Sequence, residues 1–262
     1  MEIMEFEIID CHIHPFLSPE TNTAWFPGTE TPDIFVEEMK RAGIAKCCGS
    51  VIKEMTKPSF EQIKALNREA LAFRDRYPDF FIPGIHVLPS CPEESCREIE
   101  ELYHRENVRW IGELVGYFMD YPSYLGDGMF KIYDLIQELG LPVNIHPAAF
   151  DEIGIICKNF PKMKVVIAHP CDGQEMRTRF EFVKNHPNAY LDLSGTGLFR
   201  WGMLRYGIDT AGMDKILFGS DFPICNPSMN LQAVFFEHLT ETELKAVLSG
   251  NFKRLTGLTS GT

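Results

Sequence analysis

The sequence has few basic residues relative to acidic ones and no dense run of lysine or arginine. Its 25 Lys and Arg against 37 Asp and Glu give a formal net charge of −12. Such a chain repels nucleic-acid phosphates and anionic membrane surfaces unless one local face is basic. We therefore expect a small-molecule partner, and neither a nucleic acid nor a membrane.

Further absences narrow the class of protein. The eight cysteines form no CxxC pair, which argues against a structural zinc ribbon, and we expect most of them to be reduced and buried. The first residues lack the basic and apolar regions of a signal peptide, and no run approaches the roughly 18 apolar residues of a membrane span. These absences predict a cytoplasmic protein, and they leave a homo-oligomer open.

What the sequence does contain is one pattern that recurs along its whole length. Short apolar runs rich in β-branched residues alternate with longer amphipathic stretches, which is typical of βαβ units. The runs lie near residues 6–14, 45–52, 80–88, 108–115, 142–146, 164–169, 189–194 and 216–221. Helices are predicted, for example, at residues 33–41, 59–77, 93–105, 129–139 and 174–185, with a closing helix at 241–255.

Eight such units in about 250 residues match the size of a TIM barrel. A doubly wound open sheet is the alternative, but no Gly-rich dinucleotide fingerprint follows the first run. No linker or low-complexity stretch divides the chain. We predict one α/β domain over residues 1–262, a single (β/α)8 TIM barrel with its active site at the C-terminal ends of the strands.

Possible metal ligands stand where the apolar runs end. The first run ends in Asp10-Cys11-His12-Ile13-His14, and side chains at i and i+2 of a strand share a face, so both imidazoles can reach one ion. A TIM barrel gathers all strand ends at one mouth. The other candidates at strand ends are Glu113, His146, His169 and Asp221. We further expect Asp10 to orient one of the imidazoles.

These residues resemble the signatures of the amidohydrolase superfamily, and most closely amidohydrolase family 2. The resemblance lies in the Asp-x-His-x-His start, in the histidines that end the fifth and sixth runs, and in Gly219-Ser220-Asp221-Phe222-Pro223 at the end of the eighth. It spans nearly the whole chain. It implies a metal-dependent enzyme on a TIM barrel, with Asp221 as a catalytic general base.

The resemblance leaves the number of ions open. With two ions, it implies that Glu113 bridges them, and the remaining ligands are His12, His14 and Asp221 for the first ion and His146 and His169 for the second. With one ion, His169 is instead catalytic and polarises the substrate or moves a proton, and the ligands are His12, His14, His146 and Asp221. Many members carry a carbamylated lysine at the position of Glu113, and a glutamate can also bridge, so this residue favours two ions.

The chemistry expected from these ligands is hydrolysis. Imidazoles and carboxylates suit zinc, which we predict, and also manganese or nickel. Such an ion lowers the pKa of a bound water from 15.7 to about 7. We predict a metal-dependent hydrolase of a small amide, lactone or ester. The first alternative is a zinc-dependent non-oxidative decarboxylase of an aromatic or unsaturated carboxylic acid. Others are a deoxyribonuclease, which the acidic balance disfavours, and a non-catalytic metal- or ligand-binding barrel.

Four residues are candidates for contact with the substrate. His86 ends the third run, although a histidine there can equally bond to backbone. Trp25 and Tyr117 lie on two long loops rich in aromatic residues, which either line an apolar pocket or pin the loops to the barrel. Arg200 follows the seventh run and could pair with a substrate carboxylate, whereas a charged loop residue is more often solvated.

Overall fold

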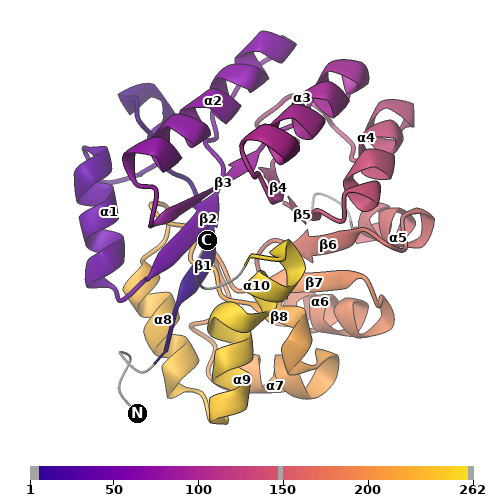
Figure 1. Cartoon of the computed structure of the whole chain (residues 1–262). Coiled ribbons are helices and arrows are strands. Elements are labelled where there is room, and N and C mark those ends of the chain that lie inside the picture. Colours follow the sequence, from indigo (N-terminus) through magenta and orange to yellow (C-terminus); the bar gives the residue numbers. More distant parts are fainter. Residues whose placement is uncertain (1–5, 147–149, 259–262) are drawn as a thin grey trace.

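The computed structural model describes residues 6–146 and 150–258. Eight parallel strands pair in sequence order around a barrel, which confirms the predicted (β/α)8 TIM barrel. In Figure 1 the helices surround the strands. The strands are β1 Ile9–Ile13, β2 Lys46–Gly49, β3 Phe81–Ile85, β4 Trp110–Leu114, β5 Pro142–Ile145, β6 Lys164–Ile167, β7 Ala189–Asp192 and β8 Ile216–Leu217.

The helices that connect and cover the strands begin at recognisable signals. Pro32 and Pro92 occupy the first positions of two helices, and Ser59 with Gln62 forms a capping box at a third. The helices are α1 Pro32–Arg41, α2 Phe60–Arg76, α3 Pro92–Arg105, α4 Asp127–Glu138, α5 Phe150–Asn159, α6 Gly173–Asn185, α7 Met203–Ala211 and α8 Pro227–Phe236. The short 3-10 helices are η2 Pro19–Thr21 and η3 Met213–Lys215.

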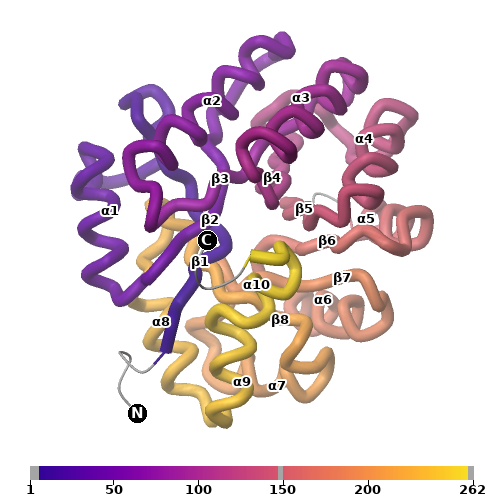
Figure 2. The backbone as a smooth tube through the Cα atoms, in the orientation of Figure 1, coloured from indigo at the N-terminus to yellow at the C-terminus, as the bar shows by residue number. Residues whose placement is uncertain are grey.

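The predicted closing helix forms in three successive pieces. They are α9 Glu241–Lys245, a π-helical turn η4 Ala246–Gly250 and α10 Asn251–Thr256. Phe252 and Leu255 of α10 pack on the interior residues Ile9, Cys11, Cys48, Trp110, Val166 and Leu217. Because Ile9 and Trp110 are the first residues of their strands, α10 covers the floor of the barrel, opposite the mouth. In Figure 2 the tube of α10 lies over the centre of the ring of strands.

The barrel closes between β1 and the segment that follows β8. The Cys11 amide donates to Phe218 O at 3.0 Å, and the His14 amide donates to Phe222 O at 2.8 Å. Between them the Asp221 amide donates to His12 O, also at 2.8 Å. The strand predicted over 216–221 is shorter, since β8 ends at Leu217, and Asp221 itself has a φ of 70°, which no regular strand adopts. Its chain still bonds to β1 and brings Asp221 beside the two histidines.

The other predictions from composition can be compared with the structure directly. All eight cysteines are free; Cys11, Cys47, Cys48 and Cys157 are buried and the other four are partly exposed. Over the described ranges, no helix is both long and apolar enough to cross a membrane.

Candidate metal centre

The structure brings all six predicted ligand residues together at the mouth. Their ligand atoms form two groups, each within 4.8 Å: His12, His14 and Asp221 in one, and Glu113, His146 and His169 in the other. All six lie in the last residues of strands or just after them, and these strand ends converge because the barrel closes. Their role as metal ligands stays a prediction.

Glu113 stands between the two groups and turns one oxygen to each. Its Oε2 lies 3.3 Å from His12 Nε2 and 3.4 Å from His14 Nε2. Its Oε1 lies 2.9 Å from His146 Nδ1 and 3.4 Å from His169 Nε2. Asp221 joins the first side only, with Oδ1 3.3 Å from His14 Nε2. One carboxylate thus contacts imidazoles of both groups, and its role as a bridging ligand stays a prediction.

Two irregularities in the sheet aim these side chains. In β1 the pairing moves from Asp10–Cys47 to Ile13–Gly49, which is three residues against two, so a bulge lies at Cys11 and His12. Cys11 faces the apolar floor while the adjacent His12 faces the polar cluster, and strict alternation would send them to opposite sides of the sheet. The bulge precedes the step from His12 to His14, so the i, i+2 relation between these two histidines holds, whereas the same spacing between Asp10 and His12 is interrupted by it.

A second irregularity in β4 aims Glu113. The pairing with β5 moves from Ile111–Val143 to Leu114–Ile145, again three residues against two. Gly112, inside this step, has a φ of 91°, and a Cβ there would lie 2.3 Å from Asn144 O. Only glycine fits such a position. The Gly-Glu pair is therefore one structural unit: the glycine permits the turn that points the carboxylate into the barrel.

Buried groups behind the histidines hold the rings in place. His12 Nδ1 lies 3.0 Å from Asp192 Oδ2, and His14 Nδ1 lies 3.1 Å from Ser50 O. With both Nδ1 atoms engaged, both Nε2 atoms face the interior. Among the described residues, His12 Nε2 makes no hydrogen bond although it is buried. A buried imidazole nitrogen that makes no hydrogen bond and lies beside carboxylates fits a divalent metal ion.

The prediction that Asp10 orients an imidazole is wrong. Its Oδ1 accepts from the backbone amides of His12 and Ser220, so it ties together the backbones of β1 and the segment after β8 and does not touch an imidazole. Asp192, which sequence reasoning missed, takes the expected role. The signal was present: Asp192 and Ser194 end the seventh run with the same i, i+2 spacing as His12 and His14.

The cluster concentrates negative charge in a buried place. Burial alone would lower the pKa of His14, but contacts with Asp221 and Glu113 outweigh it and raise that pKa to about 9. Burial alone would raise the pKa of Glu113, yet His12 and the other imidazoles hold it well below its usual range. The pKa of Asp192 is lowered to about 2, against burial, chiefly by His12. The site therefore attracts cations, and a divalent ion can replace the protons on the imidazoles.

Of the four candidate substrate residues, Tyr117 and His86 lie near the cluster. The ring of Tyr117, 61% exposed, stands edge-on to that of His146 with centroids 5.3 Å apart. His86 is buried, and its Nε2 lies 2.8 Å from Val51 O. Burial lowers the pKa of His86 to about 4, so its ring is neutral. Asn67 bonds to both its backbone amide and carbonyl, which fixes the end of β3.

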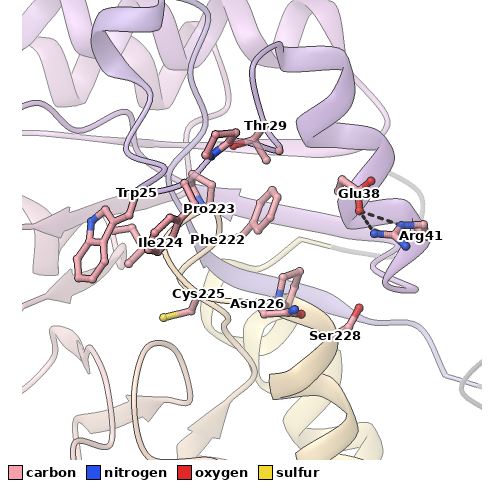
Figure 3. Close-up of a pocket in the computed structure, with 14 residues that line it drawn as sticks. Trp25, Thr29, Glu38, Arg41, Phe222, Pro223, Ile224, Cys225, Asn226 and Ser228 are labelled. Atoms are coloured by element: carbon pink, nitrogen blue, oxygen red, sulfur yellow. Dashed lines mark hydrogen bonds and ion pairs between the residues drawn. The ribbon is translucent and has the colours of Figure 1, made fainter.

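The other two, Trp25 and Arg200, contact different parts of the mouth. Trp25 is 77% exposed and lines a cavity of about 420 Å³ between the loop after β1 and the loop after β8. Figure 3 shows it beside Ile224, with Cys225 below them. The exposed Arg200 donates from Nε and Nη2 to the two carboxylate oxygens of Asp172, at 2.9 and 2.8 Å. The structure does not bring either residue into the cluster, and their contact with a substrate stays a prediction.

A family comparison agrees with this architecture. Residues 9–258 match the model of amidohydrolase family 2, whose description is amidohydrolase, so the chain belongs to this family. No curated protein sequence matches the chain.

Solved structures of the same fold cover almost the whole chain at low sequence identity. A putative amidohydrolase from Staphylococcus aureus is 17% identical with a TM-score of 0.74, covering 97% of this chain and 100% of that one. The 2,6-dihydroxybenzoate decarboxylase from Rhizobium is 14% identical with a TM-score of 0.70, covering 96% and 99%. A 5-carboxyvanillate decarboxylase from Novosphingobium aromaticivorans, complexed with manganese and a nitrobenzoic acid, is 14% identical with a TM-score of 0.73, covering 97% of each.

Proposed function

We propose that this chain is a metal-dependent decarboxylase that releases carbon dioxide from an aromatic carboxylic acid without oxidising it. The observation that carries the proposal is the exposed ring of Tyr117 against His146, because it gives the cluster an aromatic wall on which a flat substrate ring can pack. Two of the similar structures are decarboxylases of aromatic acids, which supports the same substrate class. This reverses the order of the two functions that the sequence suggested.

A divalent ion is part of this proposal. His12, His14 and Asp221 would hold it, joined by Glu113 or His146. Zinc remains our prediction for the ion, and manganese has support from the decarboxylase that binds it. When bound, the ion supplies positive charge that attracts the substrate carboxylate and stabilises negative charge as the bond to carbon dioxide breaks.

The remaining steps fall to side chains of the chain itself. Decarboxylation breaks the bond between the ring carbon and the carboxylate, and that ring carbon takes up one proton in its place. Asp221 is our candidate for the proton carrier, because its side chain is more exposed than that of Glu113, 11% against 3%, while both belong to the cluster. His169, with Nε2 turned to the cluster, is the second candidate. Tyr117 orients the substrate ring.

Hydrolysis of an amide, lactone or ester is the second candidate function. The observation that favours it is the division of Glu113, with Oε2 toward His12 and His14 and Oε1 toward His146 and His169. Such a carboxylate can bridge two ions, an arrangement suited to clamping the attacking and leaving groups of a hydrolysis. In this case Asp221 would accept the proton of the attacking water.

One set of measurements separates the two functions. The purified protein, loaded with zinc or manganese, is incubated with hydroxylated benzoic acids and with a panel of amides, lactones and esters, and metal per chain is measured by elemental analysis. One ion per chain with release of carbon dioxide is expected. Two ions in the wild type, one in Glu113→Ala, and hydrolysis without carbon dioxide release would favour the hydrolase. Glu98→Ala, which removes a buried glutamate paired with Lys64 outside the cluster, is the matched control.

Three other expectations remain proposals. They are one domain over residues 1–262, a cytoplasmic location and assembly into a homo-oligomer. Size-exclusion chromatography with light scattering would test the last of these.

A further inference from the structure

The Asp192 carboxylate accepts hydrogen bonds on both oxygens and is fully buried. Oδ2 accepts from Asn144 Nδ2 at 2.8 Å and lies 3.0 Å from His12 Nδ1. Oδ1 accepts from the His169 amide at 3.3 Å, from the Ser194 amide at 3.0 Å and from the Ser194 hydroxyl. An ionised carboxylate only accepts, so His12 Nδ1 must carry a proton in this arrangement.

Ser194 extends the same constraint to a second histidine. Its single hydroxyl proton points to Asp192 Oδ1, so toward other groups its Oγ can only accept. His169 Nδ1 lies 2.9 Å from that Oγ and must therefore be the donor. His12 and His169 then both present a bare Nε2 to the cluster when their rings are neutral, and an imidazole nitrogen must be bare to bind a metal ion.

We infer that Asp192 is a positioning residue that sets the tautomers of His12 and His169 together, the first by direct contact and the second through Ser194. His12 Nε2 lies 3.3 Å from Glu113 Oε2, and His169 Nε2 lies 3.4 Å from Glu113 Oε1. One buried carboxylate thus prepares a ligand on each side of Glu113. The inference rests on metal binding at this cluster, as the proposed function does, and it holds for one or two ions.

An amide at position 192 cannot replace the carboxylate. In Asp192→Asn one oxygen becomes an NH₂ group, which would face donors on whichever side it lies. If the NH₂ group takes the place of Oδ2, two donors face each other. The smallest change that removes this clash is for His12 to move its proton from Nδ1 to Nε2, and the nitrogen that binds the metal is then no longer bare. In Ser194→Ala, by contrast, His12 Nδ1 loses a second contact, with Ser194 Oγ at 3.0 Å, but keeps Asp192 Oδ2 at 3.0 Å, whereas His169 Nδ1 loses Ser194 Oγ, the partner that holds its proton.

The test reads the tautomers directly in protein labelled with ¹⁵N in its histidine rings and loaded with Zn²⁺. Long-range ¹⁵N–¹H spectra distinguish protonated from bare ring nitrogens. We expect protonated Nδ1 in both His12 and His169 of the wild type. In Ser194→Ala the tautomer should change at His169 alone, because Asp192 still accepts from His12 Nδ1, and in Asp192→Asn it should change at both. Ser95→Ala, which removes a buried hydroxyl bonded to Leu88 away from the cluster, should change neither.

Zn²⁺ affinity, measured by competition with a chelating dye, gives a second reading. We expect Asp192→Asn to weaken binding by about 10–100-fold, as for other groups behind metal ligands. A wild-type His169 protonated on Nε2, or a Ser194→Ala spectrum identical to the wild type, would overturn the inference. If Asp192→Asn does not fold, Ser194→Ala still decides. Neither reading needs turnover, so failure of the decarboxylase proposal would leave this test intact.

Discussion

The two ends of the barrel interior are built on opposite principles. The floor is apolar, with Trp110 packed against Phe252 of α10 at a centroid distance of 5.3 Å. The mouth buries imidazoles and carboxylates that hold one another through contacts of about 3 Å, such as His12 with Asp192. Most of these side chains are buried at both ends, but only the floor gains free energy from burial alone. The difference teaches that stability resides in one end and chemistry in the other.

The largest expected effect that separates the two ends is on activity. Asp221→Asn removes the proposed proton carrier and should lower kcat by about 10²- to 10⁴-fold. The fold should persist, because the closing bond from the residue 221 amide to His12 O is a backbone bond. Carbon dioxide release and the urea midpoint are the measurements. Asp172→Asn makes the same change at the exposed rim, and equal losses in both variants would contradict a special role for Asp221.

At the floor of the barrel the expected effect of a substitution is on stability. Trp110→Ala empties space between β4 and α10 and should cost about 3–5 kcal/mol of unfolding free energy, as other large-to-small core changes do. Urea denaturation followed by circular dichroism measures it. Trp201→Ala removes the same side chain where it is 70% exposed and should cost far less. If Trp110→Ala destroyed metal binding while leaving stability unchanged, the division between the two ends would be wrong.

A pH effect of similar size is expected at the mouth. Burial lowers the pKa of His86 from 6.5 to about 4, so the folded protein resists a proton that the unfolded chain accepts. Above pH 6.5 the His86 ring is neutral in both the folded and the unfolded protein, so it causes no loss of stability there. Between pH 6.5 and 4 stability should fall, by on the order of 3 kcal/mol at 1.36 kcal/mol per unit. His86→Gln keeps a donor for Val51 O without titrating, so a wild-type curve no steeper than that of the variant would contradict this.

The smallest effect is expected at the rim. Arg200 is already paired with Asp172 at the surface, so Arg200→Met should leave both KM and the unfolding midpoint unchanged. Steady-state kinetics with a hydroxylated benzoic acid that the protein turns over provide the check. A clear rise in KM with unchanged kcat would return Arg200 to the role of carboxylate partner that its position in the sequence suggested.

The barrel and the six clustered residues could be predicted because their signals are local. An apolar run that ends at His146 or His169 indicates both a strand and a residue at the mouth of the barrel. The bulge at Cys11 and His12 could not be predicted, since it is visible only in the pairing of β1 with β2. For the same reason the sequence could not decide whether Asp10 or Asp192 is the partner of His12. Both are carboxylates near strand ends, and only the assembled barrel decides which faces the ring.

The closure of the barrel has a consequence for how the protein is made. The bonds that seal it join His12 and His14 to Asp221 and Phe222, and the floor is finished by α10, which follows every strand in the chain. During synthesis the strands therefore leave the ribosome well before their last partners exist. Until then β1 presents an unpaired edge and the apolar floor is uncovered, and both are features that favour aggregation of a partly made chain.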